Sequence, residues 1–251
     1  MFSNRYIFIY SSVMVIIVAA ILSAAASFLK PYQERNIREE KVRNILASAD
    51  IPSTKADAED LFQMHIVKEI VVDLKGDVLS VYENGKLQQG EVRAFEINLR
   101  KEQKIKEAYL LNESQKAPGF PLYVCEKEGK TYYIIPLRGK GLWGPLYGNI
   151  AFDDDMNTIF GANFSHDKET PGLGSEIATS EFADQFEGKT IFDSDMNFVS
   201  VKVVKGGVAN SNINISHGVD AISGGTITSN GVTDMIEDCL GNYVEYIKKQ
   251  K

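Results

Sequence analysis

Residues 220–230, DAISGGTITSN, combine hydroxyl side chains with a flexible backbone just before an apolar helical pattern. The stretch holds four hydroxyls and two adjacent glycines: Ser223, Thr226, Thr228, Ser229, Gly224 and Gly225. Thr228, Ser229 or Asn230 is the expected N-cap of the helix, and Asp220 is expected to form a turn. Free N–H groups at a helix N-terminus and at glycines favour an anion such as phosphate. The same residues are equally consistent with a loop that only caps the helix, and the residues alone leave both interpretations open.

Two further glycine-rich stretches interrupt the chain. GKGLWGPLYG covers residues 139–148 and carries the only tryptophan, Trp143, while HDKETPGLG covers residues 166–174. Any one such loop is explained as a structural turn, but functional residues concentrate on loops that a rigid scaffold holds. His166 and Glu169 have H-x-x-E spacing, and no further ligands stand in a metal-binding pattern. We therefore predict no metal site and interpret His166 as a residue that shapes its loop.

Three common site motifs are excluded, one by its context and two because the sequence lacks them. GKGLWG matches the letters G-x-G-x-x-G, but a predicted hairpin strand follows it and not the helix that a dinucleotide site needs. A phosphate-binding P-loop and a G-x-S-x-G nucleophile elbow do not occur in the sequence. The net charge of -7 gives no support for a nucleic-acid partner, and none is predicted.

The first thirty residues contain an apolar run from Tyr6 to Leu29, long enough for the roughly 20 residues that span a bilayer. The small residues at 23–27, SAAAS, would also suit a cleaved signal peptide, but the run exceeds a signal core of about 7–15 residues. We expect an uncleaved anchor that ends at Lys30-Pro31. The basic residues that follow it would place the large domain in the cytoplasm: Lys30, Arg35, Arg38, Lys41 and Arg43.

The remaining elements must position the three loops. Residues 33–50 form an amphipathic pattern, and Ser53 is a candidate cap for a second helix. Alternating strands with turns at 75–77, 128–130 and 154–157 predict three hairpins, residues 198–207 predict another strand, and residues 229–249 predict the last helix.

These elements predict an α+β fold, in which a single N-terminal transmembrane helix precedes a soluble domain of antiparallel hairpins with helices at both ends. The expected divisions are an anchor at 1–30, the N-terminal part of the soluble domain at 31–120, and a ligand-binding region with the C-terminal helix at 121–251. Whether Cys125 and Cys239 pair in a disulfide stays open.

Residues 220–226, DAISGGT, resemble the motif D-x-x-[ST]-G-A-T of the FMN-binding domain family. In that family the last threonine carries FMN through a phosphoester, which a Mg²⁺-dependent flavin transferase forms with FAD as donor. The resemblance thus implies covalent FMN on Thr226. Ser223 and Gly224 fit the motif, and Gly225 replaces its alanine.

Three other blocks, GLWG at 141–144, HDKETPGLG at 166–174 and VKGG at 204–207, also resemble this family. Together with the anchor, they are similar to the C-subunit family of Na⁺-translocating NADH:quinone reductases. That resemblance implies an electron relay from NADH toward quinone, coupled to Na⁺ export. It implies partner subunits of that complex, a flavin transferase during maturation, and a bacterial inner membrane with the soluble domain in the periplasm.

The resemblance also assigns the surroundings of the flavin. Leu142 and Trp143 are expected against the isoalloxazine ring, and Lys205 is expected to place a positive charge near the flavin or its phosphate. The remaining cofactor-binding residues are expected in the 166–174 loop and the motif: Glu169, Thr170, Gly172, Leu173, Ser223, Gly224, Gly225 and Thr228.

Two alternatives are kept. The G-type component of RNF ferredoxin:NAD⁺ oxidoreductases bears FMN on the same motif, although the long region before GLWG favours the C-subunit family. A membrane-anchored binding module without a redox role is the other alternative.

Overall fold

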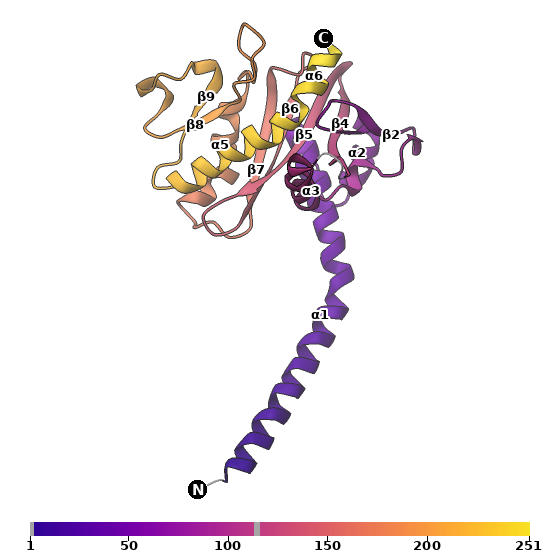
Figure 1. Ribbon diagram of the computed structural model, residues 1–251, viewed down its shortest axis with the longest axis vertical. Helices are drawn as coiled ribbons and strands as arrows, with labels where there is room; N and C mark the ends of the chain where they lie inside the picture. Colours follow the sequence, from indigo (N-terminus) through magenta and orange to yellow (C-terminus); the bar gives the residue numbers. More distant parts are fainter. Residues whose placement is uncertain (1–2, 113–115) are drawn as a thin grey trace. The chain divides into compact units, whose positions relative to one another are not determined.

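The computed structural model describes residues 3–112 and 116–251 (Figure 1). The chain divides into two compact units, 1–42 and 43–251. The first unit is helical, and the second holds every strand of the described residues and all helices after α1.

Helix α1 (Asn4–Ser48) is uninterrupted and contains Pro31. The anchor was expected to end at Lys30-Pro31, and the helix itself continues past this point to Ser48. A proline removes one N–H donor from a helix, but the helix can continue through the proline where the residues on both sides favour helical conformation. From Tyr6 to Leu29 almost every side chain is exposed, and α1 is the helix of the described residues that is long and apolar enough to cross a membrane. These properties support membrane association.

The second unit is built on a seven-stranded antiparallel sheet with the order β3-β2-β1-β4-β5-β6-β7. The bounds are β1 Ile66–Val72, β2 Val78–Glu83, β3 Lys86–Gln89, β4 Phe120–Lys127, β5 Lys130–Lys140, β6 Pro145–Phe152 and β7 Ile159–His166. All three predicted hairpins are present, so the α+β class with antiparallel hairpins is confirmed. The strand predicted at 198–207 is shorter, β8 Lys202–Val204, and pairs in parallel with β9 Gly218–Asp220 in a separate small sheet.

Helices α2 and α3 both differ from what the sequence predicted. Helix α2 (Ala58–His65) is preceded by Asp57, whose carboxylate accepts the N–H and hydroxyl of Thr54, so Ser53 is not its cap. Helix α3 (Leu99–Leu111) was not predicted, because its sequence is mostly polar. The Asn98 side chain caps it by accepting the N–H of Lys101 at 3.2 Å.

The C-terminal helix begins earlier than predicted and has two parts, α5 (Thr226–Leu240) and α6 (Val244–Gln250). Its N-cap is Gly225 and not one of residues 228–230. The short elements are α4 Ser180–Ala183, η1 Ala94–Glu96, η2 Gly174–Ala178, η3 Asp184–Phe186, η4 Val208–Asn210, η5 Ile215–His217 and η6 Gly241–Tyr243.

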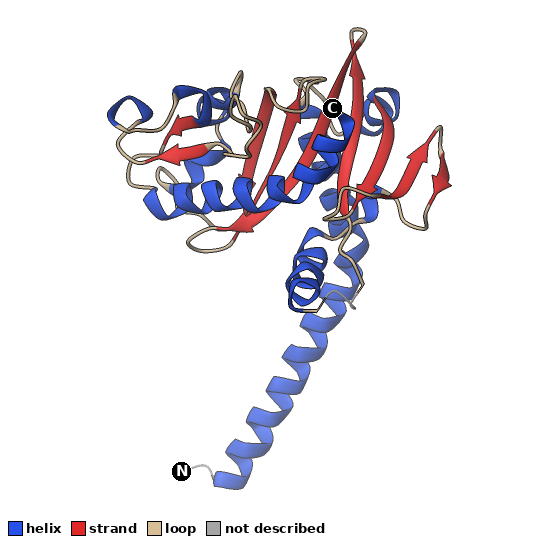
Figure 2. Ribbon diagram, turned by 45° about the horizontal axis from the view of Figure 1, so that its top comes forward, coloured by secondary structure: helices blue, strands red, loops and turns tan. Residues whose placement is uncertain are grey.

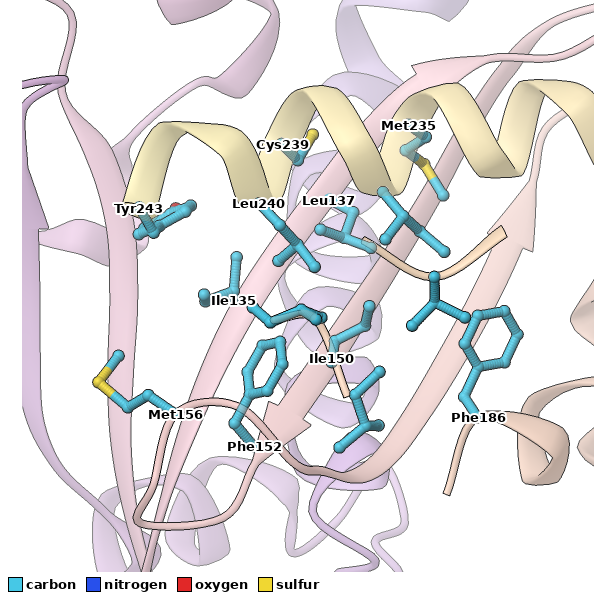
Figure 3. Close-up of a cluster of buried hydrophobic side chains, with 14 of the residues drawn as sticks. Ile135, Leu137, Ile150, Phe152, Met156, Phe186, Met235, Cys239, Leu240 and Tyr243 are labelled. Atoms are coloured by element: carbon cyan, nitrogen blue, oxygen red, sulfur yellow. The ribbon is translucent and has the colours of Figure 1, made fainter. Parts of the chain in front are cut away.

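Helix α5 crosses the sheet (Figure 2) and packs an apolar face on it. Met235 and Leu240 of the helix lie over Leu137 and Ile150 of the strands (Figure 3). Close approach depends on two glycines. A Cβ on Gly139 would lie 2.5 Å from the Cβ of Met235, and one on Gly231 would overlap the carbonyl oxygen of Lys140. This contact anchors the N-terminal half of α5 beside the end of β5, where the GLWG loop begins.

Neither cysteine forms a disulfide. Cys125 and Cys239 are both buried free thiols. Cys239 belongs to the core under α5, where its sulfur lies 3.5 Å from both the N and the O of Arg138.

Candidate functional site

The three glycine-rich loops meet at the carboxylate of Glu169, which is only 5% exposed. The hydroxyl of Thr228, in the first turn of α5, donates to its Oε2 at 2.5 Å. The N–H of Trp143, in the GLWG loop, donates to its Oε1 at 2.9 Å. One side chain thus connects three segments that are far apart in the sequence.

Burial acts to raise the pKa of the Glu169 carboxyl, because it disfavours the charged form. The hydrogen bonds from Thr228 and from the N–H groups of Trp143 and Gly144 act in the opposite direction and outweigh it. The pKa therefore lies below its ordinary value, and the group is a carboxylate at neutral pH.

The glycines of these loops provide the room that this carboxylate occupies. A Cβ on Gly141 would lie 2.6 Å from Oε1 of Glu169. A Cβ on Gly174 would overlap the hydroxyl of Thr228 and lie 2.7 Å from Oε2 of Glu169. The loop is shaped further by His166, whose Nδ1 accepts the N–H of Glu169 at 3.3 Å, which agrees with the interpretation made from the sequence.

Thr226 is the first residue of α5 and is half-buried. The N-cap Gly225 has no side chain, so the first turn of α5 has no side-chain cap. Gly224 has a φ of +74°, and a Cβ there would lie 2.6 Å from Cδ2 of Leu173. Ser229 secures the preceding loop, because its Oγ accepts the N–H of Ile222 at 3.2 Å. The result is a threonine hydroxyl beside uncapped helix N–H groups, which is the setting that favours a phosphate.

Large apolar side chains are exposed on the loops that converge here. Leu142 is 46% exposed, Trp143 64% and Leu173 42%, and Ile227, which follows Thr226, is 57% exposed. Exposed apolar side chains grouped on loops that meet at one point indicate a ligand or partner surface. Ile227 was not among the predicted site residues, although its place beside Thr226 in the motif could have suggested it.

The other predicted residues have different positions. The carbonyl of Thr170 accepts the N–H of Leu173, and Gly172, with φ +73°, donates its N–H to Glu176, so both belong to the turn of the 166–174 loop. Ser223 and Lys205 are exposed. Within residues 3–112 and 116–251, none of the hydrogen bonds or ion pairs found connects Lys205 to Glu169 or to Thr226.

The VKGG turn is nevertheless held close to the motif. Val204 pairs with Asp220 across β8 and β9, and the carboxylate of Asp220 accepts the N–H of Val208 at 2.7 Å. Asp220 was expected to form a turn in its own segment. It lies in strand β9 instead, and its carboxylate stabilises the neighbouring VKGG turn.

Comparison with known proteins connects this geometry to a family. The profile of the FMN-binding domain matches residues 141–241, which contain GLWG, the 166–174 loop and residues 220–230. The C subunit of the Na(+)-translocating NADH-quinone reductase from Vibrio vulnificus is 30% identical over 231 residues, which are 90% of this chain and 87% of that protein. The corresponding Pseudomonas aeruginosa protein is 30% identical over 238 residues, 91% of this chain and 88% of that protein.

This chain belongs to the NqrC family, the C subunits of the Na(+)-translocating NADH-quinone reductase. Solved structures agree. The crystal structure of the Parabacteroides distasonis member has 35% sequence identity and a TM-score of 0.72, covering 89% of this chain and 98% of that one. The Shewanella oneidensis NqrC structure has 25% identity and a TM-score of 0.65, covering 84% and 96%. As an NqrC family member, the chain is one component of an oxidoreductase complex and contains an FMN-binding domain.

Proposed function

We propose that the chain holds FMN in a phosphoester bond to Thr226 and relays electrons within the Na⁺-translocating NADH–quinone reductase. The observation that carries this proposal is the position of Thr226, a half-buried hydroxyl residue at N1 of a helix that has no side-chain cap. The uncapped N–H groups there suit the negative charge of a phosphate.

The attachment is a group transfer in which atoms balance and no electrons are exchanged. The hydroxyl oxygen of Thr226 forms a bond to the phosphorus of the FMN half of FAD, and the anhydride bond of FAD breaks. AMP leaves, and the hydroxyl proton passes to the transferase or to water. A flavin transferase is therefore a required partner during maturation.

The residues around Thr226 fit the rest of the cofactor. Exposed Leu142 and Trp143 offer an apolar and aromatic surface for a flat ring, with Leu173 and Ile227 on the adjoining segments. FMN, when bound, supplies the redox chemistry, and the chain supplies its attachment and surroundings. Lys205 follows the strand paired with the motif, where its charge would favour a phosphate or an anionic reduced flavin.

The proposed setting is the bacterial inner membrane, with α1 as a single-pass anchor and the soluble domain in the periplasm. The basic residues from Lys30 to Arg43 would favour the cytoplasm on their own, but partner helices in a complex can override that preference. The other subunits of the complex would pass electrons from NADH to this flavin and from it toward quinone, coupled to Na⁺ export. We place the FMN-binding region at 121–251, after the anchor at 1–30 and the segment 31–120.

The intact mass of the full chain tests the attachment. Chain produced together with a flavin transferase should weigh more than its amino acids by FMN less one water, and tandem mass spectrometry should localise this excess to Thr226. The denatured protein should keep its flavin fluorescence in a gel, and Thr226→Ala should lose both signals. A mass equal to the amino acids alone, or an adduct that persists in Thr226→Ala, would refute the proposal.

A further inference from the structure

We propose that Glu169 is a positioning residue that holds the Thr226 hydroxyl ready for flavin transfer before any flavin is present. This inference rests on the attachment proposed above. Glu169 is a buried carboxylate in another loop, 57 residues before Thr226 in the sequence. In this proposal it controls the rate at which the transferase attaches the flavin to the chain.

The carboxylate is buried without a salt bridge to any lysine or arginine of the described residues, and its charged form is favoured by the charge of His166 in its own loop. It is 5% exposed, and none of the ion pairs found in the described ranges 3–112 and 116–251 includes Glu169. A buried charge without a salt bridge depends mainly on hydrogen-bond donors for its stabilisation. Here the donors are the N–H groups of Trp143 and Gly144 and the hydroxyl of Thr228. Because leaving any of them unpaired is costly, the carboxylate holds the two donor segments in place.

The link to Thr226 passes through the first turn of α5. Thr228 is buried and is drawn inward by its bond to Glu169, whereas Ile227 is exposed and Thr226 is half-buried. Successive residues of an α-helix are turned by about 100°, so residues two apart are turned by roughly 200°. Fixing Thr228 toward the protein interior therefore turns Thr226 toward the outside, where a transferase can reach it.

Two loop glycines make room for the carboxylate of Glu169. Gly141 and Gly174 each leave the space that an oxygen of Glu169 occupies.

Glu176 offers a contrast within the same segment of the chain, because its carboxylate accepts only from Gly172 and Ser175 among the hydrogen bonds found in the described residues. These hydrogen bonds stay within its own turn and reach neither the GLWG loop nor α5, which makes Glu176→Gln the matched control.

The experiment measures loading of the full-length, detergent-solubilised chain, purified without flavin from cells that lack the transferase. Purified transferase, FAD and Mg²⁺ are added, and the initial rate of adduct formation is followed by intact mass. Glu169→Gln replaces one acceptor oxygen by an NH₂ group, so one of the donors loses its partner. We expect loading to slow by about tenfold, as the loss of one hydrogen bond to a charged group implies. Glu176→Gln should load within about twofold of the wild type.

Two further measurements separate positioning from a general loss of structure. Thr228→Val removes only the hydroxyl link and should slow loading, whereas Thr228→Ser restores the hydroxyl and should recover the rate. Hydrogen exchange before FAD is added should be faster at the amides of Trp143 and Gly144 in Glu169→Gln, and unchanged there in Glu176→Gln.

The outcomes are distinguishable. If the wild type gains no mass, the attachment proposal fails and this inference fails with it. If the wild type loads and both Glu169→Gln and Thr228→Val load at the same rate, only the positioning role is overturned. If Glu169→Gln does not fold, the comparison of Thr228→Val with Thr228→Ser decides alone.

Discussion

Replacing Gly174 by alanine tests how closely the three loops are packed. Gly174 is buried, and its φ is not among the positive values, so alanine can adopt its backbone conformation. The added Cβ would overlap the Thr228 hydroxyl and lie 2.7 Å from Oε2 of Glu169. The carboxylate cannot move away without losing a second hydrogen bond, because it also accepts the N–H of Trp143. The substitution should therefore push α5 and the 166–174 loop apart.

The size of the effect follows from two contributions. Overpacking of a tightly packed site costs about 1–3 kcal/mol. Breaking the bond between Thr228 and the ionised Glu169 costs about 1.5–3 kcal/mol. Since the two overlap, we expect a loss of roughly 3 kcal/mol. In a domain of about 200 residues this lowers the Tm by roughly 6–12 °C.

The assay is thermal unfolding of the full chain in detergent, followed by circular dichroism, with Gly144→Ala as the control. The nearest atom to a Cβ on Gly144 is Cβ of Lys168 at 3.4 Å, an ordinary contact, and Gly144 also lacks a positive φ. Gly144→Ala should therefore lie within about 1 kcal/mol of the wild type. If Gly174→Ala and Gly144→Ala unfold at the same temperature, the close packing of Gly174, Glu169 and Thr228 is refuted.

Three other predictions concern the two cysteines, Ser200 and Trp143. Burial raises the pKa of the Cys125 thiol to about 12 and that of the Cys239 thiol to about 11. Both thiols should therefore react with a disulfide-exchange reagent at pH 8 only after the protein unfolds. Rapid labelling of the folded protein would contradict their burial. Ser200 has a φ of +61°, and its buried hydroxyl has no hydrogen-bond partner among the described residues, so Ser200→Gly should raise the free energy of unfolding by about 1 kcal/mol in a denaturant titration. A lower denaturation midpoint for Ser200→Gly would show that the strain is absent. Trp143, the only tryptophan, is 64% exposed beside the proposed attachment site, so loading with FMN should quench its fluorescence, and unchanged emission would place the ring elsewhere.

The anchor and the hairpins could be predicted from local sequence, whereas the candidate attachment residue Thr226 followed from the resemblance of residues 220–226 to a family motif. The apolar run from Tyr6 to Leu29, the turns at 75–77, 128–130 and 154–157, and the motif ending at Thr226 each lie within one short stretch. The signals of the anchor and the hairpins are length, alternation and turn residues, which depend on neighbouring residues and need no knowledge of distant contacts. The errors arose where a local signal was outweighed. Pro31 did not end α1, and α3, which is mostly polar, was missed.

The contacts of Glu169 were decided only by the tertiary structure. In the sequence, His166 and Glu169 show a spacing that raises the question of a metal, whereas in the fold Glu169 meets Trp143 and Thr228, which lie 26 and 59 residues away. Sequence patterns report the preferences of one segment at a time. Which segments meet depends on how α5 packs on the sheet through Gly139 and Gly231, and that is a property of the whole core.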